Sequence, residues 1–270
     1  MLPARFPADY AMTVPRFSED ELRKEIEANA GCADRDLSEL DFEALSGDEP
    51  LTFRDCTLTG ARVKGDALSR SQWINCRIRN TEFVGTDLRE AHFLRCVFFD
   101  AEAARGVAFR FCDLTRASFS DSNLSMSQFV GGSAHEIAFA DCQMRGAKFE
   151  KMDFAFATKR RRINKARFER CLMNDATLAG LDLGGCEFHD CALTQASFER
   201  SDLTNAALAN CHLAYAETAQ ADFSGADLRG SDLSGFKLAE LRGYSGLRVS
   251  AGQQPELLAG LGVEVFPDEG

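Results

Sequence analysis

The chain places an apolar residue, most often Leu or Phe, at every fifth position from Phe53 to Leu238, with two breaks in phase. A period of five fits neither the 3.6-residue period of an α-helix nor the two-residue period of a β-strand, so the pattern indicates a repeat protein. We call these apolar positions the central residues. The first register includes Phe53, Leu58, Val63, Leu68, Trp73, Ile78, Phe83, Leu88, Phe93 and Phe98; the second begins at Phe109 and ends at Phe154; the third begins at Ile163, continues at Phe168 and ends at Leu238.

A small residue lies two positions before most central residues, as Ala221 does before Phe223 and Ser231 before Leu233. Nine of the ten cysteines occupy this position. Small side chains that recur at one place in a repeat indicate a cramped, inward-facing site. We therefore interpret the cysteines as small hydrophobic residues in a reducing compartment rather than as a disulfide framework.

The local pattern, as in Ala221-Asp222-Phe223-Ser224-Gly225, resembles the pentapeptide-repeat family over roughly residues 33–240. The resemblance implies an all-β fold: a right-handed, four-sided parallel β-helix with one pentapeptide on each face and four in each coil. Two cysteine trios support a coil of twenty residues, since their members lie twenty apart. They are Cys56, Cys76 and Cys96, and Cys171, Cys191 and Cys211. Neighbouring strands lie about 4.8 Å apart, so nine or ten coils predict a rod of roughly 45 Å.

Enzyme chemistry has no candidate in this sequence. It contains no P-loop, no G-x-S-x-G, no H-E-x-x-H and no dinucleotide-binding fingerprint, and its four His residues are scattered. No C-x-x-C pair is present, which disfavours a structural zinc site. We expect a non-enzyme without catalytic, cofactor-binding or metal-binding residues. The lack of a signal peptide and of a long apolar run favours a soluble, cytoplasmic protein without membrane contact.

Charge is distributed unevenly along the chain. Its formal net charge is −11, made up of −8 for residues 1–50, +5 for 51–162, −6 for 163–240 and −2 for 241–270. The later coils are therefore predicted to form an acidic rod that binds a basic protein partner and repels nucleic acid and membranes. As the partner-binding acidic face we select Asp202, Asp222, Asp227 and Asp232. Simple solubility is the alternative explanation for these charges.

The ends of the chain differ from the repeat. Residues 1–32 form an N-terminal extension in which Ser18 and Glu21 have the spacing of a helix capping box, and this helix is expected to cover the first coil. Residues 241–270 predict a short helix that starts near Pro255, followed by a strand over 263–266. The segment either caps the last coil or also builds a homodimer interface. The residues selected for dimerisation are Leu257, Leu258, Leu261, Val263 and Val265.

The repeat is interrupted at residues 100–106 and 155–163, where the phase of the central residues changes. The second interruption carries four consecutive cations, which a β-helix face cannot accommodate, so we predict a projecting loop; a solvated bulge is the alternative. The two loops are candidate partner-binding sites. Their selected residues are Asp100, Glu102, Arg105, Lys159, Arg160, Arg161 and Arg162.

Within the pentapeptide-repeat family the chain is most similar to the Qnr quinolone-resistance proteins, with the mycobacterial MfpA and the albicidin-resistance proteins as wider relatives. The resemblance rests on four stretches: residues 96–106, residues 123–129, residues 130–149 and the tail from Leu257 to Val265. Such proteins have a small loop and a large loop where this chain changes phase, and a C-terminal helix at a dimer interface. The extra residues before residue 51 and the basic centre of the second loop depart from the family.

The resemblance implies a dimeric, DNA-mimicking protein that binds DNA gyrase or topoisomerase IV and relieves inhibition by fluoroquinolones. Binding of a carboxylate-lined rod to a basic DNA-binding surface is the physical basis of this expectation. A non-catalytic scaffold or effector with an unrelated partner is the alternative.

Overall fold

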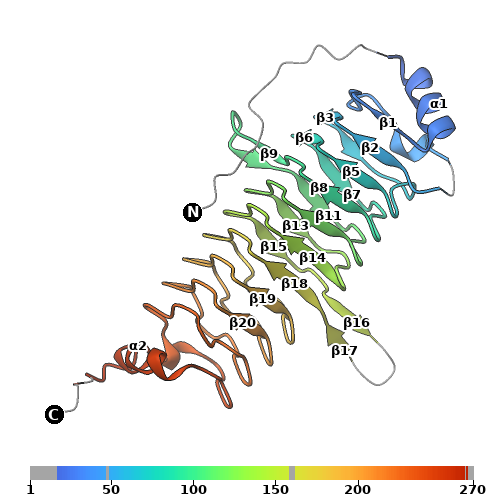
Figure 1. The fold of residues 1–270 in the computed structure, drawn as a ribbon. Helices are drawn as coiled ribbons and strands as arrows, with labels where there is room; N and C mark the ends of the chain where they lie inside the picture. The colour runs from blue at the N-terminus through green and yellow to red at the C-terminus, as the bar shows by residue number, and fades with distance from the viewer. Residues whose placement is uncertain (1–16, 47–48, 158–161, 265, 267–270) are drawn as a thin grey trace.

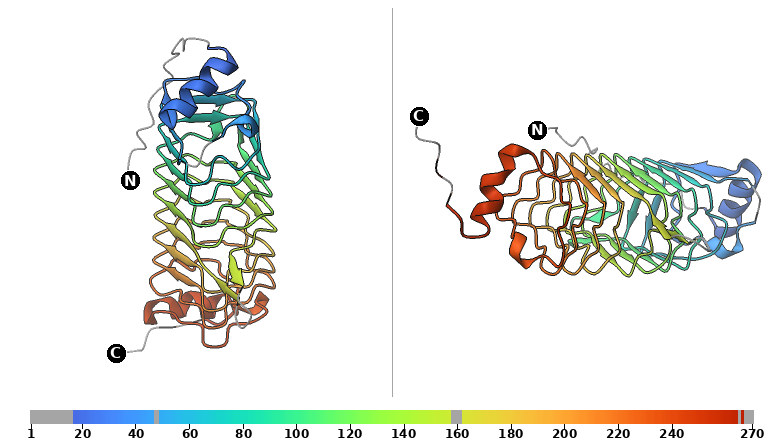
Figure 2. Two further views of the ribbon diagram at one scale, coloured as in Figure 1. Left: turned by 90° about the vertical axis from the view of Figure 1, so that its right-hand side faces the viewer. Right: turned by 90° about the horizontal axis from the view of Figure 1, so that it is seen from below.

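The computed structural model describes residues 17–46, 49–157, 162–264 and 266. It shows a parallel β-solenoid of about nine turns, with the helix α1 (Glu19–Asn29) at one end and α2 (Gln254–Ala259) at the other (Figures 1 and 2). The predicted pentapeptide-repeat fold is confirmed. None of the helices in the described ranges is long and apolar enough to cross a membrane.

The coil has four faces, on each of which successive turns pair in parallel. Face 1 is a nine-stranded sheet of β1 (Gly31–Ala33), β2 (Thr52–Arg54), β5 (Gln72–Ile74), β8 (His92–Leu94), β12 (Ser118–Ser120), β14 (Ile137–Ala140), β18 (Ala166–Glu169), β19 (Glu187–His189) and β20 (Ala207–Ala209). Face 2 contains β3 (Thr57–Thr59) and β6 (Arg77–Arg79) and continues as single bridges. Face 3 is a five-stranded sheet of β4 (Arg62–Val63), β7 (Glu82–Val84), β11 (Ala108–Arg110), β13 (Gln128–Val130) and β15 (Lys148–Glu150). Face 4 is made of single bridges, for example between Asp182 and Asp202.

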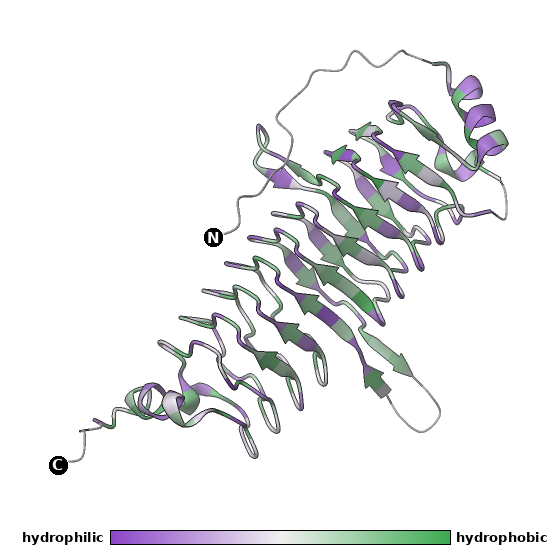
Figure 3. Ribbon diagram, viewed as in Figure 1, coloured by the Kyte–Doolittle hydropathy of each residue, from purple (hydrophilic) through white to green (hydrophobic). Residues whose placement is uncertain are grey.

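Central residues fill the inside of the coil and stack from one turn to the next. On face 1, the rings of Phe168 and Phe188 lie 4.7 Å apart between centroids with an interplanar angle of 2°. On face 3, Phe109 and Phe129 stack at 5.0 Å. In most strands of faces 1 and 3 a buried residue lies between partly or fully exposed ones, as in β12. The strands in Figure 3 accordingly show hydrophobic beside hydrophilic residues. This alternation lets a three-residue strand have one apolar and one polar side.

Ile163 is a correction to the predicted register. The five-residue phase counts it as a central residue, yet its side chain is 48% exposed. It lies in an inserted hairpin, and the repeat resumes only at Phe168, which is fully buried.

The two cysteine trios belong to a single ladder that runs along the corner before face 2. The ladder comprises Cys56, Cys76, Cys96, Ser122, Cys142, Cys171, Cys191, Cys211 and Ser231. From Cys76 onward, its thiols donate to the carbonyl oxygen of the face 1 central residue one coil earlier, as Cys96 does to Trp73 at 3.3 Å. Burial raises the pKa of Cys186, a thiol outside the ladder, to about 12. These thiols act as small buried donors, as the sequence predicts.

Each interruption of the repeat is an antiparallel β-hairpin. Hairpin A consists of β9 (Phe99–Asp100) and β10 (Arg105–Gly106) and projects between faces 2 and 3. Hairpin B consists of β16 (Ala155–Ala157) and β17 (Arg162–Asn164) and projects between faces 4 and 1. These two corners are diagonally opposite, so the hairpins extend to opposite sides of the rod (Figure 1).

The N-terminal cap agrees with the sequence. Ser18 and Glu21 form the predicted capping box, and Leu22 and Ile26 are buried toward the first coil. The helix ends at Asn29, and the next residue, Ala30, takes the left-handed conformation (φ 50°). The 3-10 helix η1 (Phe42–Ala44) replaces a strand in this first coil.

At the other end, the 3-10 helices η2 (Leu238–Glu240) and η3 (Ala251–Gln253) precede α2. Gln253 anchors this segment: its buried amide nitrogen donates to the carbonyls of Leu228 (2.8 Å) and Ser231 (2.6 Å). The strand predicted over 263–266 is absent from the described residues of that stretch. They lie beyond the last coil, where no neighbouring strand is available for pairing.

Candidate protein-interaction surfaces

Face 4 carries a ladder of aspartates. They occupy the position before the central residue in successive coils, with Ser133 at one rung. The ladder consists of Asp87, Asp113, Ser133, Asp153, Asp182, Asp202 and Asp222. Since neighbouring rungs are about 4.8 Å apart, this face presents a line of closely spaced carboxylates.

A local hydrogen bond accounts for aspartate at each rung. The carboxylate accepts from the backbone N–H two residues later, at 3.0 Å for Asp113 and Thr115 and at 2.9 Å for Asp202 and Thr204. This Asx-turn starts the corner that follows the strand. The side chains thus have a structural role as well as a charge.

The four aspartates selected as an acidic face do not share one face. Asp202 and Asp222 lie on the face 4 ladder, whereas Asp227 lies on face 1 and Asp232 on face 2. The sequence interpretation was wrong here because each pentapeptide turns the chain by one face, so aspartates five residues apart point in different directions. Successive rungs of the ladder lie twenty residues apart, or 26 residues apart across hairpin A and 29 across hairpin B.

Neighbouring arginines partly neutralise two of these aspartates: Arg242 lies 3.7 Å from Asp222, and Asp227 has two such partners. Asp227 is paired with Arg229 at 2.7 Å, and Arg248 lies at 3.8 Å. The bond with Arg229 lowers the pKa of Asp227 to about 2. Hydrogen bonds from Ser234 lower the pKa of Asp232.

Hairpin A is held by two of its three selected residues. Asp100 accepts from the backbone N–H groups of Glu102 (3.0 Å) and Ala103 (3.1 Å), which closes the tip and lowers the pKa of Asp100. Asp100 also accepts from the Asn80 amide at 2.8 Å, and Arg105 donates to the oxygen of the same amide. Asp100 and Arg105 therefore position the hairpin, and Glu102 is exposed at its tip.

Hairpin B presents an apolar pair that the sequence interpretation did not select. Phe156 and Ile163 are directly opposite each other in the β16–β17 ladder and are 56% and 48% exposed. The ring of Phe156 lies 5.5 Å from that of His135 in the preceding coil. Phe156 lies outside the five-residue phase, and this is the signal that could have identified it, whereas Ile163 is in phase with Phe168 and gives no such signal. Of the selected cations, Lys159, Arg160 and Arg161 lie outside the described residues, as does the side chain of Arg162.

The C-terminal segment has a buried side and an exposed apolar side. Leu257 is 9% exposed and packs against the last coil, whereas Leu258, Leu261 and Val263 are 36%, 47% and 46% exposed. Phe266, which was not selected, is 78% exposed. Val265 lies outside the described residues. The structure thus brings the described members of the selected group together beyond the last coil.

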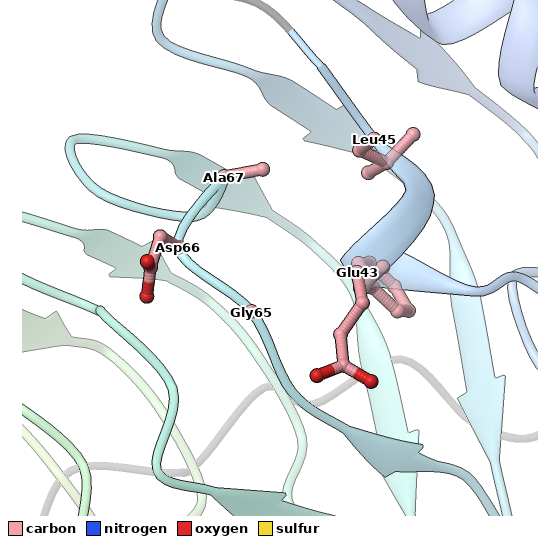
Figure 4. Close-up of a pocket in the computed structure, with 6 residues that line it drawn as sticks. Glu43, Leu45, Gly65, Asp66 and Ala67 are labelled. Atoms are coloured by element: carbon pink, nitrogen blue, oxygen red, sulfur yellow. The ribbon is translucent and has the colours of Figure 1, made fainter.

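One cavity, of about 430 Å³, is lined by Phe42, Glu43, Leu45, Gly65, Asp66 and Ala67, of which Glu43 and Asp66 are exposed (Figure 4). In the part of the chain that the structure describes, no group of three His, Cys, Asp or Glu side chains is arranged to hold a metal ion.

The fold and these surfaces define a class: a four-sided solenoid whose distinctive features are exposed hairpins, a carboxylate ladder and an apolar end. The family model for the pentapeptide repeat region matches residues 161–240. Together with the four-faced coil that the central residues build, this identifies the chain as a pentapeptide-repeat protein.

One curated relative is a quinolone resistance protein. The quinolone resistance pentapeptide repeat protein QnrB96 from Scandinavium goeteborgense is 29% identical over 97 residues, which are 36% of this chain and 45% of that relative. The match thus spans less than half the length of QnrB96.

Two solved structures share the fold. Full-length QnrB1, a plasmid-mediated fluoroquinolone resistance protein, has a TM-score of 0.59 at 24% identity, covering 77% of this chain and 97% of QnrB1. A trypsin-treated form of QnrB1 gives 0.58 at 23% identity, covering 78% and 99%.

Proposed function

We propose that this protein is a non-catalytic homodimer that binds bacterial type II topoisomerase, DNA gyrase or topoisomerase IV, and protects it from fluoroquinolones. The observation that carries the proposal is the likeness to the Qnr proteins. The chain shares sequence identity with QnrB96, and its solenoid matches the structure of QnrB1 over nearly the whole length of QnrB1. The two hairpins add support, since the family resemblance implies a small and a large loop at these breaks in the repeat.

The face 4 ladder is the surface that we assign to binding. Duplex DNA presents one phosphate about every 3.4 Å along each strand, and the ladder presents rungs about every 4.8 Å. A straight row of carboxylates on a rod is therefore complementary to a groove that binds a DNA backbone through Lys and Arg. Attraction between such surfaces weakens with salt because exposed charges are screened over about 8–10 Å.

The exposed apolar residues beyond α2 are the surface that we assign to the homodimer. A two-fold interface uses the same patch on both subunits, so one compact patch at the end of a rod is enough to form it. Joining the rods at this end brings the acidic later coils together at the centre and leaves the net-positive coils of residues 51–162 outermost.

Two measurements with purified gyrase test the proposal: its affinity for this protein, and supercoiling with and without a fluoroquinolone as the protein is titrated. We expect direct binding and restoration of supercoiling in the presence of the drug. If the protein binds gyrase at no concentration tested, the proposal is wrong, and a scaffold with an unrelated partner becomes the better explanation.

A matched pair of variants tests the assigned surface. Asp113→Asn with Asp202→Asn removes two charges from the ladder while the amide oxygen can keep each Asx-turn. Asp190→Asn with Asp232→Asn removes two charges from outside face 4. We expect the ladder variant to bind gyrase about tenfold or more weakly and with a flatter salt dependence, whereas the control changes affinity much less. Equal losses would exclude face 4 as the specific surface.

A further inference from the structure

Cys32 differs from the other nine cysteines in position and exposure. It lies in β1, in the first coil, where it takes the place of a face 1 central residue and pairs in register with Phe53 of the next coil. It is partly exposed, whereas the other nine thiols are buried. Cys32 is therefore the thiol that solvent reaches most readily.

A second thiol lies directly behind it. Cys56 begins the cysteine ladder in the next coil, and the two Sγ atoms are 3.8 Å apart. This proximity follows from the architecture, because ladder thiols point at the face 1 central residue one coil earlier, and here that residue is itself a cysteine. A disulfide needs an S–S distance of about 2.05 Å, so the sulfur atoms would have to approach by less than about 2 Å.

Solvent reaches Cys32 through a cavity of about 450 Å³ at the N-terminal cap. Helix α1 contributes Glu25 and Asn29 to its lining, β1 contributes Cys32, and Thr52 and Arg54 come from β2. A small oxidant can enter this space and meet Cys32 first.

We infer that Cys32 and Cys56 form a reversible disulfide when the protein meets a two-electron oxidant such as hydrogen peroxide. The Cys32 thiol gives up its proton as its sulfur attacks one peroxide oxygen; the S–O bond forms, the O–O bond breaks, and the leaving hydroxide takes up that proton to become water. The Cys56 sulfur then loses its proton and attacks the Cys32 sulfur, so that the S–S bond forms and the second water leaves. Two thiols are oxidised by two electrons, and one peroxide is reduced to two waters.

The disulfide would lock the N-terminal cap to the solenoid. In the reduced protein the first coil is joined to the second by the three-residue β1–β2 pairing and by few further backbone bonds, and α1 buries only Leu22 and Ile26. A covalent link from residue 32 to residue 56 closes a loop that contains η1 and β2, which restricts the unfolded cap. This inference is independent of the proposed function, since it concerns the end of the rod farthest from α2.

The test compares the full-length protein with Cys32→Ser, Cys56→Ser and a control, Cys112→Ala, after treatment with hydrogen peroxide. Remaining thiols are alkylated in denaturant and counted by mass spectrometry. Of ten cysteines we expect eight to be alkylated in the oxidised protein, with one cross-linked peptide joining residues 32 and 56. Cys56→Ser is expected to fold, because Ser122 and Ser231 occupy the same ladder position.

Oxidation should raise Tm by on the order of 5 °C and slow hydrogen exchange of the β1 amides, and dithiothreitol should reverse both effects. The control should behave like the parent, and both serine variants should show neither effect. Ten alkylated cysteines, a cross-link between another pair, or oxidation of Cys32 to a sulfinic acid without a cross-link would each overturn the inference.

Discussion

Whether a buried hydroxyl or thiol of this solenoid finds a hydrogen-bond acceptor depends on which backbone carbonyls remain available inside the coil. Inward hydroxyls and thiols normally donate to a carbonyl of the previous coil, as Ser201 does to Leu178 at 2.7 Å. Ser127 is an exception: its hydroxyl is buried and has no hydrogen-bond partner. The equivalent acceptor would be the carbonyl of Phe98, which instead accepts from the backbone N–H of Val107, where hairpin A closes at 3.0 Å. The closing hydrogen bond of hairpin A thus uses the Phe98 carbonyl, which would otherwise be the acceptor for Ser127.

This contrast predicts opposite effects for the same substitution. Ser127→Ala removes a buried group without a partner and should leave the free energy of unfolding unchanged or raise it by about 1 kcal/mol. Ser201→Ala removes a satisfied hydroxyl and leaves the Leu178 carbonyl with one bond fewer, so it should lower that free energy by about 1 kcal/mol. Urea unfolding of both variants measures the difference. Destabilisation of equal size would show that Ser127 has a partner.

Asp227 predicts a stability contribution that depends on pH. Its pKa in the folded protein is about 2, against about 3.9 for an unfolded aspartate. A depressed folded-state pKa means that the stabilisation is complete above pH 4 and is lost as the pH falls toward 2. The parent should therefore be more stable than Asp227→Asn at pH 6, and the two melting temperatures should converge as the pH approaches 2. A constant difference across this range would contradict the role assigned to the Arg229 pair.

At the scale of elements, the two hairpins are insertions that leave the coil intact. Phe93 pairs with Phe119 across hairpin A, and Phe139 pairs with Phe168 across hairpin B, so the stacking of face 1 continues past both. The closing bond of hairpin B runs from the Lys165 N–H to the Phe154 carbonyl at 3.1 Å. Removal of either hairpin would take no core residue from the solenoid, so the hairpins are available to bind a partner.

Shortening hairpin B tests that role. Residues 158–161 can be replaced by Asn-Gly, which suits a two-residue turn between the paired residues 157 and 162. We expect the fold and most of the gyrase affinity to remain, while the rescue of supercoiling in a fluoroquinolone falls sharply. A second variant with Lys159→Gln, Arg160→Gln and Arg161→Gln keeps the length of hairpin B and removes three of its charges. It therefore distinguishes an effect of charge from an effect of hairpin length. Full protection by the shortened variant would refute a protective role of the hairpin tip.

At the scale of the whole molecule, the two ends of the rod are capped differently. The N-terminal end is covered by α1, whereas in and beyond α2 four described apolar side chains remain exposed, and a dimer would bury them. Leu258, Leu261, Val263 and Phe266 form this set. Capping matters because the open end of a solenoid offers unpaired backbone groups to other chains.

Sedimentation of a targeted variant tests the dimer. Leu261→Glu combined with Val263→Glu introduces charge at the exposed positions and leaves the Gln253 anchor in place. We expect the mass to fall from that of a dimer to that of the 29.7 kDa chain. Tyr215→Glu, at an exposed aromatic residue on the side of the rod, serves as the control and should remain dimeric. A dimer in the double variant would move the interface elsewhere.

The sequence alone determined the coil. The five-residue period, with a small residue two positions before most central residues, predicted the inward positions of Phe168, Phe188 and Cys191, and the resemblance to the pentapeptide-repeat family implied the four-sided coil. The capping box at Ser18 and the places of both interruptions were equally local signals. Such features are visible because each depends on residues close together in the chain.

The tertiary structure alone decided which residues share a surface. Two insertions change the spacing between equivalent positions from 20 to 26 and 29 residues. They thereby conceal the single cysteine ladder, the aspartate ladder of face 4 and the outward position of Ile163. The approach of Cys32 to Cys56 is of the same kind, because it joins a central residue of one coil to a ladder residue of the next. A repeat specifies the coil through short-range pattern, but its faces are built from residues a full coil apart, and only the stacked coils bring those together.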